Sequence, residues 1–161
     1  MHYGLVPTVE ASVLIGAPPE TVAEVLLDAT KAPLWTAGLE RMEVVSGEPG
    51  TAGCVGRAHY VEGGRRYILA DVLDHVTPNR RYVARVSGNG ITARVETTLQ
   101  PIGDRATQLT LQWDGHGTAP LTRVLIPLMK RRIAARADAD LGALRDLVEA
   151  DLEPEHRLDT S

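Results

Sequence analysis

The sequence predicts an α+β fold in which a curved, seven-stranded antiparallel sheet surrounds one long C-terminal helix, in the order β-α-α-β-β-β-β-β-β-α. Three observations lead to this expectation: an alternating segment near the start, six strand-length segments separated by turn clusters, and one sustained helical period over residues 119–151. Strands joined by tight turns pair antiparallel. The apolar side of the helix needs a partner, so we expect it to cover the concave face of the sheet.

The first strand is expected over residues 9–15, where small apolar side chains alternate with polar ones. Pro18 and Pro19 end this strand and open a helix, because proline suits the first helical turn, where its missing N–H is not needed. A second short helix is expected over residues 30–36, and it ends at Gly38.

Six further strands follow, each ending at a cluster of Gly, Pro or Asn residues that suits a hairpin. They are predicted over residues 40–45, 54–61, 66–76, 81–86, 91–99 and 107–113. Gly63 and Gly64 form the most compact of these connections and predict a two-residue hairpin turn.

The long helix shows one apolar stripe at steps of three, four and seven residues. Its members are Ile126, Met129, Ile133, Ala137, Leu144 and Val148. Around Pro127 the apolar residues fall on a different face, namely Leu121, Val124, Leu125 and Leu128. Because proline removes a backbone donor, we expect either a short lead-in helix or a kink there.

Asp140 falls within the apolar stripe of this helix. A carboxylate that points inward either borders water or needs a partner. Two interpretations stay open: a functional carboxylate in a cavity, or a slightly rotated helix with Asp140 at its rim.

The totals describe one ordinary domain, predicted over residues 1–152, with a polar tail at 153–161 that we expect to be disordered. The net charge of -4 argues against nucleic acid or an anionic membrane surface as the main partner. Cys54 is the single cysteine and no apolar run approaches the length of a membrane span. A cytoplasmic protein is therefore expected, with no membrane insertion.

The chain resembles the START-like or SRPBCC superfamily, which has the helix-grip fold. The resemblance covers about residues 8–151 and depends on the order of several short motifs. They are Ala17-Pro18-Pro19-Glu20-Thr21-Val22, Leu26-Leu27-Asp28, Pro33-Leu34-Trp35, Thr77-Pro78-Asn79-Arg80-Arg81-Tyr82, Ala106-Thr107-Gln108-Leu109-Thr110, and Asp140-Leu141 with Leu144.

This resemblance implies an internal cavity for a hydrophobic small molecule and a protein like the polyketide cyclases and dehydratases of bacterial secondary metabolism. A non-catalytic carrier of a lipid or other apolar metabolite is the alternative, and a co-chaperone-like interaction module is a third hypothesis. We expect a monomer or homodimer with no cofactor and no metal. The predicted lining consists of Trp35, Tyr67, Tyr82, Thr97, Leu99, Leu111, Trp113, Met129 and Ile133.

The candidate catalytic residues are Asp140, His59 and Arg57, which would supply a proton-transfer pair and a fixed cation. His59 and Arg57 share one face of their strand, and Tyr60 lies on the other, so the hypothesis requires the first face to point inward. Similar aromatase/cyclases use an Asp, an Arg and a His; the Asp corresponds to Asp140, whereas the other positions fall nearest Asp74 and Trp113.

Overall fold

The computed structural model describes residues 8–158, and the side chains of residues 9–152. The strands are β1 (Thr8–Ile15), β2 (Leu39–Ser46), β3 (Val55–Glu62), β4 (Arg65–Thr77), β5 (Arg81–Gly88), β6 (Ile91–Ile102) and β7 (Ala106–Gly117). The helices are α1 (Pro19–Leu26), α2 (Ala32–Trp35), α3 (Pro120–Leu128) and α4 (Lys130–Leu158).

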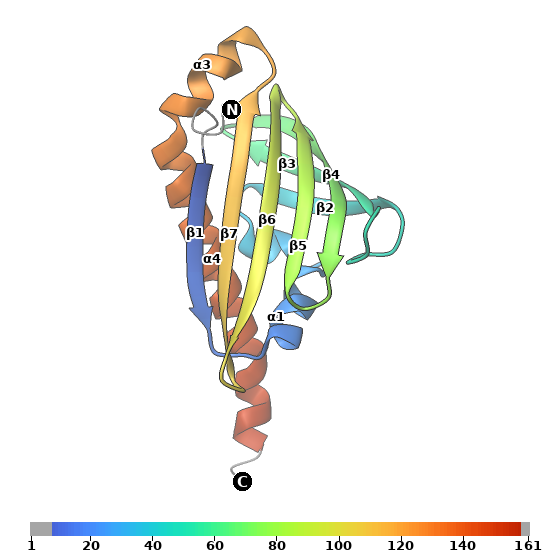
Figure 1. Ribbon diagram of the computed structural model, residues 1–161, viewed down its shortest axis with the longest axis vertical. Helices are drawn as coiled ribbons and strands as arrows, with labels where there is room; N and C mark the ends of the chain where they lie inside the picture. Colours follow the sequence, from blue (N-terminus) through green and yellow to red (C-terminus); the bar gives the residue numbers. More distant parts are fainter. Residues whose placement is uncertain (1–7, 159–161) are drawn as a thin grey trace.

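The strands form one antiparallel sheet in the order β1-β7-β6-β5-β4-β3-β2. β1, β7 and β6 run along α4, whereas β2 and β3 cross behind them at a steep angle (Figure 1). This curvature gives the sheet a concave face, and α4 lies against it. The predicted seven-stranded antiparallel sheet with a long C-terminal helix is confirmed.

The end of the concave face next to α1 is closed by close packing. Leu99 and Leu109 from adjacent strands meet Leu144 and Val148 of α4, and these side chains are at most 2% exposed. The Thr107 hydroxyl donates a 2.7 Å hydrogen bond to the carbonyl oxygen of Ala17, which satisfies the polar group buried there. This end therefore serves stability rather than ligand access.

The ends of β7 and α4 differ most from the sequence expectation. β7 continues past Trp113 to Gly117, because the Trp113 ring lies over Gly115, where a Cβ atom would come within 2.2 Å of it. α4 continues to Leu158, beyond the start of the expected tail at residue 153. The first residues of the expected domain (1–7) and the end of the expected tail (159–161) lie outside the described residues.

The expected lead-in helix is α3, which runs through Pro127 and ends at Leu128, so the break before α4 falls at Met129. α3 packs on the end of β7 that is far from α1. The Thr122 hydroxyl donates to the Gly90 carbonyl at 2.7 Å. At Gly117 a Cβ atom would lie 2.1 Å from the Thr122 backbone, so only glycine allows this approach. α3 therefore occupies the end of the molecule opposite the packed core (Figure 1).

Candidate functional site

The β3–β4 hairpin determines which side chains face α4. Gly63 and Gly64 form the predicted two-residue turn, both with positive φ, and the register pairs Tyr60 with Tyr67. The Arg136 guanidinium of α4 lies 5.6 Å from the centroid of the Tyr60 ring. Tyr60 and Tyr67 therefore occupy the concave face.

His59 and Arg57 consequently lie on the outer face, because neighbouring residues of a strand point to opposite sides. The His59 Nε2 atom is 3.2 Å from a carboxylate oxygen of Glu43 and 3.4 Å from the Arg41 guanidinium, both on β2. The inward placement expected for His59 and Arg57 is wrong, and neither shares a cavity with Asp140. The sheet twist and the α4 contacts select the opposite face.

An aromatic and ionic cluster connects the sheet to α4. The Tyr60 and Tyr67 rings stack with centroids 5.2 Å apart. Arg136 pairs with the Glu62 carboxylate and also donates to the Ala37 carbonyl oxygen. Burial raises the pKa of Tyr60 to about 12, which Arg136 only partly offsets. Tyr60 is therefore a neutral phenol that can donate or accept a hydrogen bond.

Asp71 is the functional candidate that the sequence analysis missed. It lies on β4 opposite Gly56 and Val86, on the concave face with Tyr67 and Leu73. Among the described residues its carboxylate has no hydrogen-bond or ion-pair partner, and burial raises its pKa to about 6. The alternation Tyr67, Leu69, Asp71, Leu73 contained the signal, because an acid interrupts an otherwise apolar and aromatic face.

Asp140 lies at the rim of the concave face rather than deep inside it. It accepts a 3.0 Å hydrogen bond from the Ala37 backbone N–H, and burial raises the pKa of its carboxyl. With Trp35 it lines an open pocket of about 550 Å³ between α2, β2 and α4. The Trp35 indole N–H is buried there and has no hydrogen-bond partner in the described part of the chain.

The other predicted lining residues divide into two groups. Tyr82, Thr97 and Leu99 are at most 8% exposed, and the Tyr82 hydroxyl accepts a bond from the Asn79 N–H, so these side chains belong to the packed core. Trp113, Leu111 and Ile133 are half-buried, and Met129 is 36% exposed. The accessible part of the concave face is therefore the part closer to α3.

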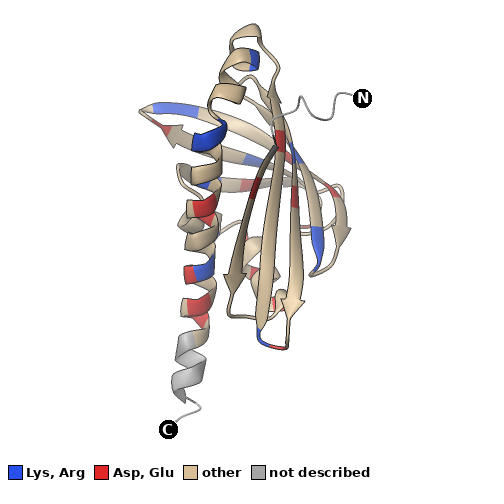
Figure 2. Ribbon diagram, turned by 60° about the vertical axis from the view of Figure 1, so that its left-hand side comes forward, with Lys and Arg blue, Asp and Glu red and all other residues tan. Residues whose placement is uncertain are grey.

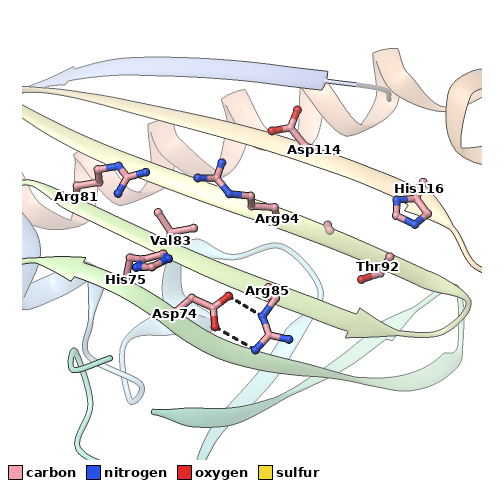
Figure 3. A pocket seen from close by; sticks show the side chains of 10 residues that line it. Asp74, His75, Arg81, Val83, Arg85, Thr92, Arg94, Asp114 and His116 are labelled. Atoms are coloured by element: carbon pink, nitrogen blue, oxygen red, sulfur yellow. Dashed lines mark hydrogen bonds and ion pairs between the residues drawn. The ribbon is translucent and has the colours of Figure 1, made fainter. Parts of the chain in front are cut away.

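A second pocket, of about 420 Å³, lies on the outer face of β4–β7 (Figure 3). Arg85 makes a bidentate ion pair with Asp74, at 2.6 and 3.0 Å. Arg81 and Arg94 both pair with Glu96. Carboxylates thus balance these guanidinium groups, which leaves little net charge to attract an anion.

Within residues 8–158, no three His, Cys, Asp or Glu side chains gather closely enough to hold a metal ion. No helix in this range has the length and apolar character needed to cross a bilayer.

The sequence matches a known protein family over most of its length. Residues 6–149 match the family described as polyketide cyclase / dehydrase and lipid transport, and the chain belongs to that family. Solved structures share the helix-grip arrangement that the START/SRPBCC-like resemblance predicted. No curated protein matches the chain.

Three solved structures illustrate the likeness. TTHA0849 from Thermus thermophilus superimposes with a TM-score of 0.75 at 22% identity, covering 90% of this chain and 99% of that one. The Zhui aromatase/cyclase from Streptomyces sp. R1128 gives 0.72 at 22% identity, with coverages of 88% and 93%. A START superfamily protein from Mycobacterium smegmatis gives 0.64 at 15% identity, with coverages of 87% and 98%. At these identities the similarity establishes the fold alone.

Proposed function

We propose that this protein binds a hydrophobic small molecule of the aromatic polyketide type between α4 and the concave face of the sheet. The observation that carries the proposal is Asp71, whose carboxyl has no charged partner in the described part of the chain and lies on a face made of aromatic and apolar side chains. Such a face with a few polar groups is typical of small-molecule sites. The neutral Tyr60 phenol supplies a second hydrogen-bonding group.

The same carboxyl suits cyclase or dehydratase chemistry. With a pKa of about 6, Asp71 exchanges a proton readily near neutral pH. In a dehydration, its carboxylate takes the proton next to a ligand carbonyl, the carbon–carbon double bond forms, and the carbon–oxygen bond of the hydroxyl breaks. The departing hydroxide takes the proton back from Asp71 and leaves as water, which regenerates the carboxylate.

Tryptophan fluorescence provides a test, because the chain has two tryptophans: Trp35 lines the pocket beside Asp140, and Trp113 is half-buried on β7. Emodin, a hydroxylated anthraquinone, should quench this fluorescence saturably, and Asp71→Leu should weaken its binding several-fold. Asp74→Leu is the matched control, since Asp74 pairs with Arg85 on the outer face. If emodin, a hydroxylated naphthoquinone and a long-chain fatty acid all fail to bind, the proposal is wrong.

A non-catalytic carrier is the second candidate. It is favoured because the two positions nearest the Arg and His of similar aromatase/cyclases hold Asp74, paired outward with Arg85, and Trp113. A carrier should bind apolar ligands equally well when Asp71 becomes Asn, and no variant should alter a reaction rate. An enzyme should keep binding in Asp71→Asn but lose turnover by roughly a hundredfold.

A further inference from the structure

The exposed apolar side of α3 is the largest feature of the molecule that the proposed ligand site leaves unexplained. Thr122 and Ile126 face the sheet, and the opposite side carries four aliphatic residues. Their exposed fractions are 69% for Leu121, 62% for Val124, 38% for Leu125 and 76% for Leu128. Side chains this apolar and this exposed, gathered on one helix side, indicate an interaction surface.

Basic residues surround this stripe. Residues 115–137 contain no Asp or Glu, although the whole chain carries a net charge of -4. Four exposed basic residues on α3 and the first turn of α4 have no ion-pair partner among the described side chains: Arg123, Lys130, Arg131 and Arg132. Basic residues lie at the α3 end of α4, whereas acidic residues lie further along it (Figure 2).

We propose that α3 and the first turn of α4 form a docking surface for an anionic lipid bilayer. Aliphatic side chains flanked by Lys and Arg fit the boundary between acyl chains and headgroups, because the first enter the apolar layer and the second meet lipid phosphates. α3 also projects from one end of the elongated molecule, so its stripe reaches a flat surface without obstruction by the sheet (Figures 1 and 2). A projecting aliphatic ridge favours a deformable bilayer over a folded protein partner.

The net negative charge of the whole chain argues against binding to an anionic membrane, but binding depends on the charges that lie close to the lipid surface. Electrostatic attraction at a lipid surface fades within about 10 Å at ordinary ionic strength, so distant acids at the other end of α4 contribute little. Docking here is peripheral and involves no membrane-spanning segment.

Flotation with vesicles tests the surface without any ligand. The full chain should float with phosphatidylcholine vesicles that contain about one third phosphatidylglycerol, and raised salt should weaken this binding. Leu121→Gln with Leu128→Gln should weaken it by about tenfold. Arg131→Gln with Arg132→Gln should weaken it by about twenty-fivefold, since each cation contributes about fivefold.

The control removes the same charge from the opposite end of the sheet. Arg80→Gln with Arg105→Gln, in the β4–β5 and β6–β7 turns, should bind vesicles like the unaltered protein. Circular dichroism should show that every variant is folded. Equal binding to pure phosphatidylcholine, unaltered binding in both α3 variants, or binding only to an acidic protein and to no vesicle would overturn the proposal.

Discussion

The Asp140 carboxylate on α4 accepts a hydrogen bond of 3.0 Å from the backbone N–H of Ala37, which lies between α2 and β2. Arg136, one helical turn earlier, donates to the Ala37 carbonyl oxygen. Two side chains of α4 thus hold both backbone groups of one residue at the edge of the concave face. Asp140 therefore holds the segment that follows Trp35 in place, which is a structural role.

Replacement of Asp140 should therefore reveal how much its hydrogen bond to Ala37 stabilises the fold. Asp140→Leu removes the acceptor and should lower the free energy of unfolding by about 1 kcal/mol. Asp140→Asn retains an acceptor oxygen and should stay close to the unaltered protein. Urea denaturation measures both, with Asp138→Leu as an exposed neighbouring control. Equal loss in the Leu and Asn variants would contradict the assigned hydrogen bond.

Asp71 should make the stability of the protein depend on pH. Because burial raises the pKa of its carboxyl from 3.8 to about 6, the folded state binds more protons than the unfolded state between these values. Its contribution is therefore fully present below about pH 4 and is lost as the pH rises through about 6. Asp71→Asn should be more stable than the unaltered protein at about pH 8, by on the order of 3 kcal/mol, and equally stable at low pH.

Asp74→Asn is the matched comparison three residues further along β4. The hydrogen bond from Arg85 lowers the pKa of the Asp74 carboxyl, so its contribution is present above the ordinary pKa and is lost on acidification. This variant should be less stable than the unaltered protein at neutral pH and equal to it in strong acid. Thermal unfolding across pH would show two opposite profiles, and identical profiles would contradict the assigned environments.

Substitution of two neighbouring residues on β3 should have different effects on ligand affinity. Tyr60→Ala removes a concave-face phenol and its stacking with Tyr67, and should weaken emodin binding by about tenfold. His59→Ala alters only the outer-face contacts with Glu43 and Arg41, and should leave binding within about twofold. Fluorescence titration compares them. A greater loss in His59→Ala than in Tyr60→Ala would mean that the face assignment is wrong.

Replacement of two glycines by alanine should change the free energy of unfolding in opposite directions. A Cβ atom at Gly115 would meet the Trp113 ring, so Gly115→Ala should lower the free energy of unfolding by about 1–3 kcal/mol and alter tryptophan fluorescence. A Cβ atom added at Gly142 would meet no described atom within 4 Å apart from its own neighbourhood in the helix, and α4 is helical there. Gly142→Ala should raise stability by about 0.5–1 kcal/mol. Chemical denaturation monitored by fluorescence measures both effects.

Local sequence patterns predicted some elements correctly but missed the extent of β7. Turn chemistry predicted the Gly63–Gly64 hairpin and its register, because two residues with positive φ are a local property of glycine. Periodicity likewise located α3 before α4 and the buried side of Leu144 and Val148. The extent of β7 required the Trp113–Gly115 contact, which no local pattern contains.

The sequence by itself determined the order of the elements, the pairing of strands joined by tight turns and the residues that share a face, since these depend on short-range periodicity and turn geometry. The pairing of β1 with β7, about 100 residues apart in the chain, was decided by the tertiary structure. Only the tertiary structure decided which face of β3 and β4 lies against α4. Both faces contain polar and apolar residues, so local patterning gives them similar burial energies, and the choice comes from sheet curvature and the Arg136–Tyr60 contact. That choice places Tyr60 and Asp71, rather than His59 and Arg57, on the concave face, because neighbouring residues of a strand point to opposite sides.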